Sequence, residues 1–415
     1  MVIALPPGGS RAVARCDALG VAPYSDMEGG LYRGYLTPAY AAAQEALARW
    51  MAQAGMAVRR DAAANLIGRY EGTRPDAPAL LIGSHLDSVR DGGRYDGPLG
   101  IMLGVEAVEA LDWMGQRPPF PIEVIAFGDE EGSRFPAAML TSRAVAGTLA
   151  ADALAIADAA GVPLAEAGVN LTDYLSAARA PGSTLAYLET HIEQGPVLEA
   201  EGLAVGTVTG IAAQLRYQVV VTGMAGHAGT SAMPLRRDAL AGTAEMILAI
   251  ETIARDDASD LVATVGQIAA LPGAPNVIAG DIRFSIDIRS GDEARRDQAA
   301  EAMLDTIVRI AERRGLGIDT QRIHDLPASP CDPALMDLMD AAIADAGHRR
   351  FRLVSGAGHD AMVMAAHCPT AMLFIRCKDG ISHHPAEHVD PADADVALQV
   401  MLGFIHRLGA TFDPA

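Results

Sequence analysis

The segment PIEVIAFGDEEGSRF, residues 121–135, decides the fold class of this 415-residue chain. Its first part, Pro121 to Phe127, is a short apolar run of the kind that forms a buried strand. A similar run, ALLIGSHL at 79–86, precedes it, and the residues between them at 99–111 have a helical pattern. Strands that alternate with helices predict an α/β fold in which helices cover both faces of a sheet.

The sequence pattern changes after Gly210 and predicts a second domain. Four segments read as strands and two as helices, in the order β-α-β-β-α-β of the split βαβ unit found in ferredoxin-like domains. The strands are expected at 215–223, 261–269, 282–290 and 316–323, and the helices at 234–256 and 292–314.

The alternation of apolar strands and helices found in the first part then resumes, with a helix expected at 333–346, a strand at 370–376 and a final helix. We therefore predict a discontinuous catalytic domain, residues 1–210 and 327–415, that contains a mixed sheet flanked by helices. Residues 211–326 are expected to form an inserted ferredoxin-like domain.

Two further helices are expected in the first part of the chain. Thr37 and Pro38 are suited to the N-cap and the first helical position, and Gly55 to the stop, of an amphipathic helix. An Ala-rich stretch at 150–160 is expected to be helical rather than a linker.

The composition excludes several classes of function. The chain has 52 acidic and 32 basic side chains, a net charge of −20, and no run of Lys or Arg that could follow a nucleic-acid backbone. The same acidity repels small anions, so a carboxylate substrate needs local positive charge from metals or arginines.

Cysteine spacing and the N-terminus indicate a cytoplasmic protein. The four cysteines are scattered without a C-x-x-C pair, which argues against a disulfide framework and against a cysteine zinc site. The first residues, MVIALPPGGSR, lack the basic region of a signal peptide. No apolar stretch approaches the roughly 18 residues of a membrane span, so no membrane association is expected.

Histidines and carboxylates follow several predicted strands. Because open α/β sheets bind ligands beyond the carboxyl ends of their strands, these side chains are expected to converge. They are His85, Asp87, Asp96, Glu130, Glu131, His191, His383 and His384. Oxygen and imidazole donors without thiolates suit a catalytic site for Zn²⁺, Mn²⁺, Co²⁺ or Ni²⁺. Each residue alone also has an ordinary interpretation as a loop or core residue, and only their conjunction favours a metal site.

The adjacent glutamates fit a metal-dependent hydrolase. Neighbouring side chains diverge in a strand or turn, so Glu131 can coordinate a metal while Glu130 acts as general base toward a water. A bridge from Asp96 would hold two metals ~3.5 to 4 Å apart. Asp87, two residues after His85, is spaced to hold that imidazole in one tautomer.

Seven motifs in order carry a resemblance to a known family. They are GSHLDSVRDGGRYDGPLG, GDEEGSRFP, LETHIEQGPVLE, GHAGTSAMPLRRDAL, PNVIAGDIRFSIDIR, SGAGHDAM and GISHHPAEH. The chain resembles the di-metal amidohydrolases that include N-carbamoyl-L-amino acid hydrolases, β-ureidopropionase and allantoate amidohydrolase, which are relatives of aminoacylase and carboxypeptidase-type exopeptidases.

The resemblance implies two divalent metal ions in each subunit. One would be held by His85, Asp96 and His191, and the other by Asp96, Glu131 and His383, with Glu130 as general base. The motif GISHHPAEH has a second histidine, His384, where the family usually has Asn or Ser, so either histidine of the pair could be the ligand.

The resemblance also implies a substrate site and an assembly. His227 would stabilise the oxyanion, and Asn276 and Arg289 would bind the carboxylate of a small-molecule substrate. Gln194, Gly358 and His359 would complete the pocket. The inserted domain would serve as a lid or dimerisation domain, which implies a homodimer.

The expected activity is hydrolysis of a C–N bond in a substrate such as an N-carbamoyl-L-amino acid or allantoate. A hydrolase of N-acyl amino acid conjugates, a dipeptidase and a non-catalytic binding protein are the alternatives. A serine hydrolase is disfavoured because the sequence has no G-x-S-x-G motif and no evident triad partners for Ser84 or Ser355.

Overall fold

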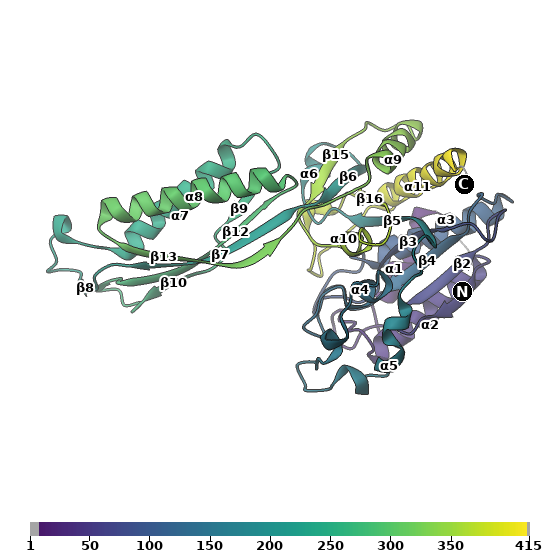
Figure 1. The fold of residues 1–415 in the computed structure, drawn as a ribbon, viewed down its shortest axis with the longest axis horizontal. Coiled ribbons are helices and arrows are strands. Elements are labelled where there is room, and N and C mark those ends of the chain that lie inside the picture. Colours follow the sequence, from purple (N-terminus) through teal and green to yellow (C-terminus); the bar gives the residue numbers. More distant parts are fainter. Residues whose placement is uncertain (1–7, 413–415) are drawn as a thin grey trace. The chain divides into compact units, whose positions relative to one another are not determined.

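The computed structural model describes residues 8–412, which divide into two compact units (Figure 1). Unit 1 contains the chain up to Thr209, Cys331–Leu353 and the chain from Gly358 onward. Unit 2 contains Gly210–Pro330 and Val354–Ala357. Each unit has its own cluster of buried apolar side chains.

A nine-stranded sheet, most of it in unit 1, has the strand order β1-β2-β4-β3-β5-β16-β6-β14, with β15 paired to β6; β14 and the last residues of β6 and β15 are counted with unit 2. The central strands β4, β3, β5 and β16 are parallel to their neighbours within this group, and the outer pairs are antiparallel. The strands are β1 (Ala57–Arg60), β2 (Leu66–Tyr70), β3 (Ala79–His85), β4 (Ile122–Phe127), β5 (Thr184–Ile192), β6 (Val205–Ile211), β14 (Ser329–Pro330), β15 (Arg352–Ser355) and β16 (Thr370–Ile375). The expected mixed sheet is thereby confirmed.

Helices pack against this sheet. Helix α3 contacts β3, β4 and β5, helices α9 and α11 contact β16, and α2 contacts β1 and β2. The α-helices of unit 1 are α1 (Gly9–Leu19), α2 (Pro38–Gln53), α3 (Pro98–Trp113), α4 (Leu140–Val145), α5 (Leu171–Tyr174), α6 (Val197–Ala200), α9 (Pro333–Asp345), α10 (Asp360–Met364) and α11 (Pro391–Thr411). Because the central strands are covered, β3, β4 and β16 are buried along their whole length, which explains their unbroken apolar runs.

Helix starts follow the capping signals in the sequence. The Thr37 side chain accepts a hydrogen bond from the Tyr40 amide, and Pro38 occupies the first turn of α2, as predicted. Asp332 and Asp390 cap α9 and α11 in the same way, each followed by a proline.

The Ala-rich stretch at 150–160 is not the helix that we expected. Only Ala151–Leu154 form a short 3₁₀ turn, and Ala157 pairs with Pro163 in an isolated bridge. Leu154 is the single buried side chain of that turn. Without an apolar stripe to bury, the helix propensity of alanine is too weak to sustain a helix of this length.

Unit 2 is an antiparallel sheet with two long helices. The strand order is β10-β12-β7-β13, with β9 also paired to β12, and β8 pairs with β11 in a separate two-stranded ribbon. The elements are β7 (Ala213–Thr222), β8 (Gly226–His227), α7 (Ala239–Asp256), β9 (Val262–Thr264), β10 (Ile268–Leu271), β11 (Val277–Ile278), β12 (Asp281–Ser290), α8 (Glu293–Arg314) and β13 (Gly317–Leu326).

The prediction of one strand at 261–269 is wrong in one respect. Two short strands, β9 and β10, occupy this region and pair with different parts of β12.

Among the residues from 8 to 412, no helix combines the length and the apolar character needed to cross a membrane.

Candidate metal centre

The predicted ligands of unit 1 lie at one edge of its sheet. His85 is the last residue of β3, Glu130 and Glu131 follow β4, and His191 is near the end of β5. The strands β4, β3 and β5 are adjacent and parallel, so their carboxyl ends meet at the same edge.

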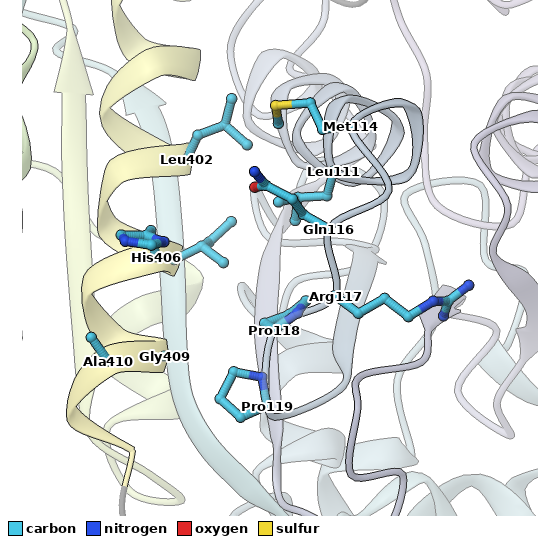
Figure 2. Close-up of a pocket in the computed structure, with 11 residues that line it drawn as sticks. Leu111, Met114, Gln116, Arg117, Pro118, Pro119, Leu402, His406, Gly409 and Ala410 are labelled. Carbon is cyan, nitrogen blue, oxygen red and sulfur yellow. The ribbon is translucent and has the colours of Figure 1, made fainter.

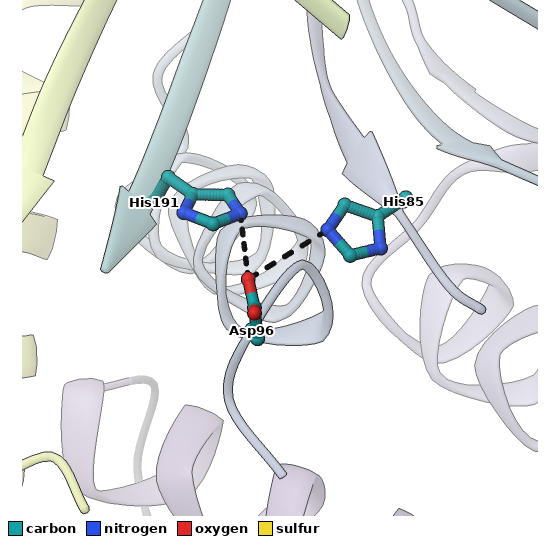
Figure 3. A group of neighbouring side chains, drawn as sticks. All are labelled: His85, Asp96 and His191. Carbon is teal, nitrogen blue, oxygen red and sulfur yellow. Dashed lines mark ion pairs between the residues drawn. The ribbon is translucent and has the colours of Figure 1, made fainter. Parts of the chain in front are cut away.

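The first group of candidate ligands consists of His85, Asp96 and His191, all of them buried (Figure 3). Oδ1 of Asp96 lies 3.1 Å from Nε2 of His191 and 3.8 Å from Nε2 of His85. The donor atoms of the three residues are within 4.8 Å of one another, which is the spacing of ligands around a single ion.

Asp96 also belongs to a second group. Its other oxygen, Oδ2, lies 3.1 Å from Nε2 of His383, and the same nitrogen lies 3.4 Å from Oε1 of Glu131. His85, Glu130 and Glu131 form a third, overlapping group. One carboxylate therefore faces two sets of donors, which is the arrangement that a bridging ligand requires.

Both buried imidazoles present Nε2 to Asp96. Nδ1 of His191 donates to the main-chain carbonyl of Ile192 at 2.9 Å, and Nδ1 of His85 donates to that of Asp87 at 3.1 Å. Because a carbonyl oxygen can only accept, these bonds place a proton on Nδ1, so Nε2 is the nitrogen that can offer a lone pair to a metal ion. Metal-binding histidines are oriented in this way.

Orphaned polar atoms at the centre of the site fit a bound cation. Oδ1 of Asp96 and Nε2 of His191 are buried, yet neither has a hydrogen-bond partner among the described residues. An unsatisfied acceptor and an unsatisfied lone pair that face each other are costly, and a positive ion between them would satisfy both.

The electrostatics of the site also fit cations. Burial, together with the charges of Asp360 and Glu131, raises the pKa of Glu130 well above its usual value. Burial and the charge of Asp96 raise the pKa of Glu131 to about 7. Burial alone would lower the pKa of His85, but the surrounding carboxylates raise it well above the ordinary value. Without cations, the site therefore holds more negative charge than it can easily neutralise.

The side chain of Asp87 is placed differently from the expectation. Its Oδ1 lies 3.8 Å from Nδ1 of His85, too far for a hydrogen bond, and the main-chain carbonyl of Asp87 holds the ring instead. The carboxylate accepts hydrogen bonds from the main-chain amides of Glu130 and Glu131, each at 3.3 Å. The carboxylate of Asp87 therefore holds the main chain at Glu130 and Glu131 rather than the ring of His85.

The two histidines of the SHH motif are also distinguished. His383, at a left-handed φ of 56°, is in the second group, whereas Nδ1 of the exposed His384 accepts a hydrogen bond from the amide of Ala386. Gln194, at φ 57°, donates to Oδ2 of Asp96 at 3.0 Å. Left-handed backbone at two non-glycine residues beside the site costs energy that the fold must supply elsewhere.

Of the other predicted pocket residues in unit 1, His359 packs edge-on against His191, with ring centroids 4.4 Å apart. Burial lowers the pKa of His359 well below its ordinary value. Gly358 precedes it at the start of α10. A hollow of about 470 Å³ elsewhere in unit 1 is lined by the end of α3, the segment that follows it and α11 (Figure 2), and none of the predicted site residues lines it.

The remaining predicted site residues, His227, Asn276 and Arg289, belong to unit 2. His227 on β8 is next to Asn276, because β8 pairs with β11 and the amide of Ala228 donates to the carbonyl of Asn276 at 2.9 Å. Arg289 on β12 binds Asp287 through Nε at 2.7 Å and donates to the carbonyl of Gly356 at 2.5 Å. Arg216, Asp287 and Arg289 line a hollow of about 730 Å³ within this unit.

The sequence of this chain was compared with protein-family models. Residues 81–407 match the model of Peptidase family M20/M25/M40. The chain belongs to this family.

Several proteins are similar to this family M20/M25/M40 chain along nearly its whole length. The N-carbamoyl-L-amino acid amidohydrolase of Geobacillus stearothermophilus is 43% identical, over 92% of this chain and 94% of that protein. Allantoate deiminase 1 of Glycine max is 38% identical, over 96% of this chain and 89% of that protein. The crystal structure of an amidase of the hydantoinase/carbamoylase family from Burkholderia multivorans has a TM-score of 0.89 at 34% identity and covers 98% of each chain.

Three polar residues around the candidate ligands were not predicted from the sequence. Glu189 on β5 accepts hydrogen bonds from the amide of Ala361 and from Ser84. Ser382 and Glu387 contact the loop that carries Asp96. The only signal in the sequence was proximity, since Glu189 is two residues before His191, and Ser382 and Glu387 flank the SHH histidines.

Proposed function

We propose that this protein is a metal-dependent amidohydrolase that cleaves a non-peptide C–N bond in a small carboxylate substrate such as an N-carbamoyl-L-amino acid or allantoate. The observation that carries the proposal is Asp96, whose two oxygens face two separate sets of donors beside the buried Glu130. The N-carbamoyl amino acid and allantoate relatives supply the substrate class.

His85, Asp96 and His191 would hold one divalent ion, and Asp96, Glu131 and His383 the other. When bound, two such ions polarise the substrate carbonyl and acidify an attacking water. Zinc, manganese, cobalt and nickel all suit these oxygen and imidazole donors.

Glu130 would be the general base. It is buried, it belongs to the group with His85 and Glu131, and its amide is held by the carboxylate of Asp87. It accepts a proton from the attacking water and delivers that proton to the leaving nitrogen. The raised pKa of Glu130 suits both steps of this transfer. It makes the carboxylate a stronger base toward the water, and the carboxyl group that results can still donate its proton to the leaving nitrogen near neutral pH.

Unit 2 would supply substrate-binding residues. Its strand order β10-β12-β7-β13, with helices α7 and α8, supports a ferredoxin-like topology. Its role as a lid or dimerisation domain, and the homodimer, are proposed from the family resemblance. His227 would stabilise the oxyanion, while Asn276 and Arg289 bind the substrate carboxylate. Gln194, Gly358 and His359 would line the pocket from unit 1. A cytoplasmic location agrees with four free, buried cysteines.

A substrate panel tests the proposal. Protein loaded with manganese, zinc or nickel is assayed for ammonia release from N-carbamoyl-L-amino acids and from allantoate, and for amine release from N-acyl amino acids and dipeptides. Ammonia release from the first two classes is the expected result. Turnover of only acyl or peptide substrates would contradict the proposed substrate class, and metal binding without any turnover would indicate a binding protein.

A further inference from the structure

A buried glutamate outside the predicted ligand set contacts the loop that carries Asp96. Oε1 of Glu387 accepts hydrogen bonds from the main-chain amides of Tyr95 at 2.8 Å and of Asp96 at 3.1 Å. Glu387 is 5% exposed. A buried carboxylate that accepts two main-chain amides fixes the backbone at that point, because each of those amides would otherwise be buried without a partner.

The second oxygen of Glu387 faces Ser382. Oε2 of Glu387 lies 3.3 Å from Oγ of Ser382, and the same hydroxyl donates to Oδ2 of Asp96 at 2.8 Å. Ser382 directly precedes His383. Glu387 therefore holds the main chain of Asp96 directly, and its second oxygen lies beside the hydroxyl that donates to the side-chain oxygen of Asp96 facing His383.

A glycine makes this contact possible. A Cβ atom added to Gly93 would lie 2.1 Å from the carboxyl carbon of Glu387 and 2.2 Å from its Oε1. Any other residue at position 93 would push the carboxylate away from the amides of Tyr95 and Asp96. The GGRYD loop and the SHHPAEH loop are thus complementary in shape as well as in hydrogen bonding.

We propose that Glu387 is a positioning residue that sets the orientation of the Asp96 carboxylate, so that each of its oxygens faces a different metal ion. This inference rests on the proposed function, since it assumes that Asp96 bridges two ions. The first ion site depends less on Glu387, because His85 and His191 are anchored on strands β3 and β5. The second site depends on it more, because its ligand His383 is on the same loop as Ser382 and Glu387.

Titration of the metal-free protein with Mn²⁺ tests this role without any substrate. The stoichiometry and the affinities are measured from the free-Mn²⁺ signal in electron paramagnetic resonance for wild type, Glu387→Ala and Glu387→Gln. Wild type is expected to bind two ions. Glu387→Ala should bind the first ion with nearly wild-type affinity and the second about 10- to 100-fold more weakly, the usual cost of losing a partner of a metal ligand.

Glu387→Gln distinguishes positioning from general loss of stability. The amide oxygen of Gln can still accept from Tyr95 and Asp96, so this variant should recover much of the affinity for the second ion. Gly93→Ala, which keeps the carboxylate but displaces it, should weaken the second ion as Glu387→Ala does and serves if Glu387→Ala fails to fold. Glu123→Ala, which removes a buried carboxylate paired with Arg179 and Arg69 elsewhere in unit 1, is the matched control and should bind both ions normally.

The outcomes separate the two proposals. If wild type binds two ions and both Glu387→Ala and Gly93→Ala bind them as tightly, the positioning role of Glu387 is overturned and the proposed function stands. If wild type binds fewer than two ions, the bridging role of Asp96 fails, and the inference about Glu387 fails with it. Equal weakening of the second ion in Glu123→Ala would also overturn the inference, because it would assign the effect to stability alone.

Discussion

Oδ2 of Asp96 lies 3.1 Å from Nε2 of His383, although the two residues are in opposite halves of the sequence. The other oxygen of Asp96 lies equally close, 3.1 Å, to Nε2 of His191. A single carboxylate thus joins a histidine on a central strand to a histidine on a loop before the last helix.

Replacement of Asp96 by Asn should remove both metal ions. The amide keeps the shape of the side chain but lacks the charge that two cations share, so we expect affinity for each ion to fall about 100-fold or more. Metal content after dialysis measures this directly. Asp91→Asn is the control, because Asp91 is on the same loop but exposed and outside every candidate group; loss of metal there would contradict a specific role for Asp96.

Variants of the two adjacent glutamates should lose different properties, turnover in one case and metal binding in the other. Glu130→Gln should retain both ions and lose about 10²- to 10⁴-fold in kcat, the usual contribution of a general base. Glu131→Gln should lose the second ion. Metal content and kcat are measured on the same preparations. Substantial turnover in Glu130→Gln would show that another group accepts the proton.

The two histidines of the SHH motif are separated by a pair of alanine variants. His383→Ala should lose the second ion, since Nε2 of His383 is near both Asp96 and Glu131. His384→Ala should bind both ions within about twofold of wild type, as expected for an exposed residue outside the site. The reverse result in the same Mn²⁺ titration would assign the ligand to His384.

Arg289 should affect substrate binding rather than metal binding. Loss of a charged, two-pronged contact to a carboxylate costs about 1.5–3 kcal/mol, so Arg289→Ala should raise KM roughly 10- to 100-fold. Arg283, on the same strand and mostly exposed beside Asp281, is the matched control. Steady-state kinetics on N-carbamoyl amino acids measure the effect, and an unchanged KM in Arg289→Ala would remove Arg289 from the substrate site.

The ion pair of Glu123 predicts a dependence of stability on pH. Burial alone would raise the pKa of Glu123, but Arg179 and Arg69 hold it below the ordinary value of 4.5. Because the folded state has the lower pKa, this carboxylate stabilises the protein above pH 4.5, and the benefit disappears as the pH falls through the lowered pKa.

Glu123→Gln should therefore lower the free energy of unfolding by about 1–3 kcal/mol at pH 7. The difference from wild type should shrink as the pH is lowered below 4.5. Urea unfolding at several pH values measures it. A difference that stays constant down to acid pH would mean that the charge of Glu123 is not the cause.

The sequence by itself determined the fold class and the kinds of donor at the site. Apolar runs such as 79–86 and 121–127 predict buried strands because burial on both faces leaves no polar positions, and Thr37 and Pro38 mark a helix start by local capping alone. Local patterns failed for the Ala-rich stretch at 150–160, where helix formation depended on an apolar face that alanines do not provide.

Only the tertiary structure decided how the donors are arranged. That the carbonyl rather than the carboxylate of Asp87 holds His85, that His383 rather than His384 faces Asp96, and that Glu387 reaches the loop of Asp96 all depend on side-chain direction and on contacts between distant segments. Residue spacing along a chain limits which residue types can meet, but the direction in which each side chain points is set by the backbone angles and the packing that the whole fold imposes.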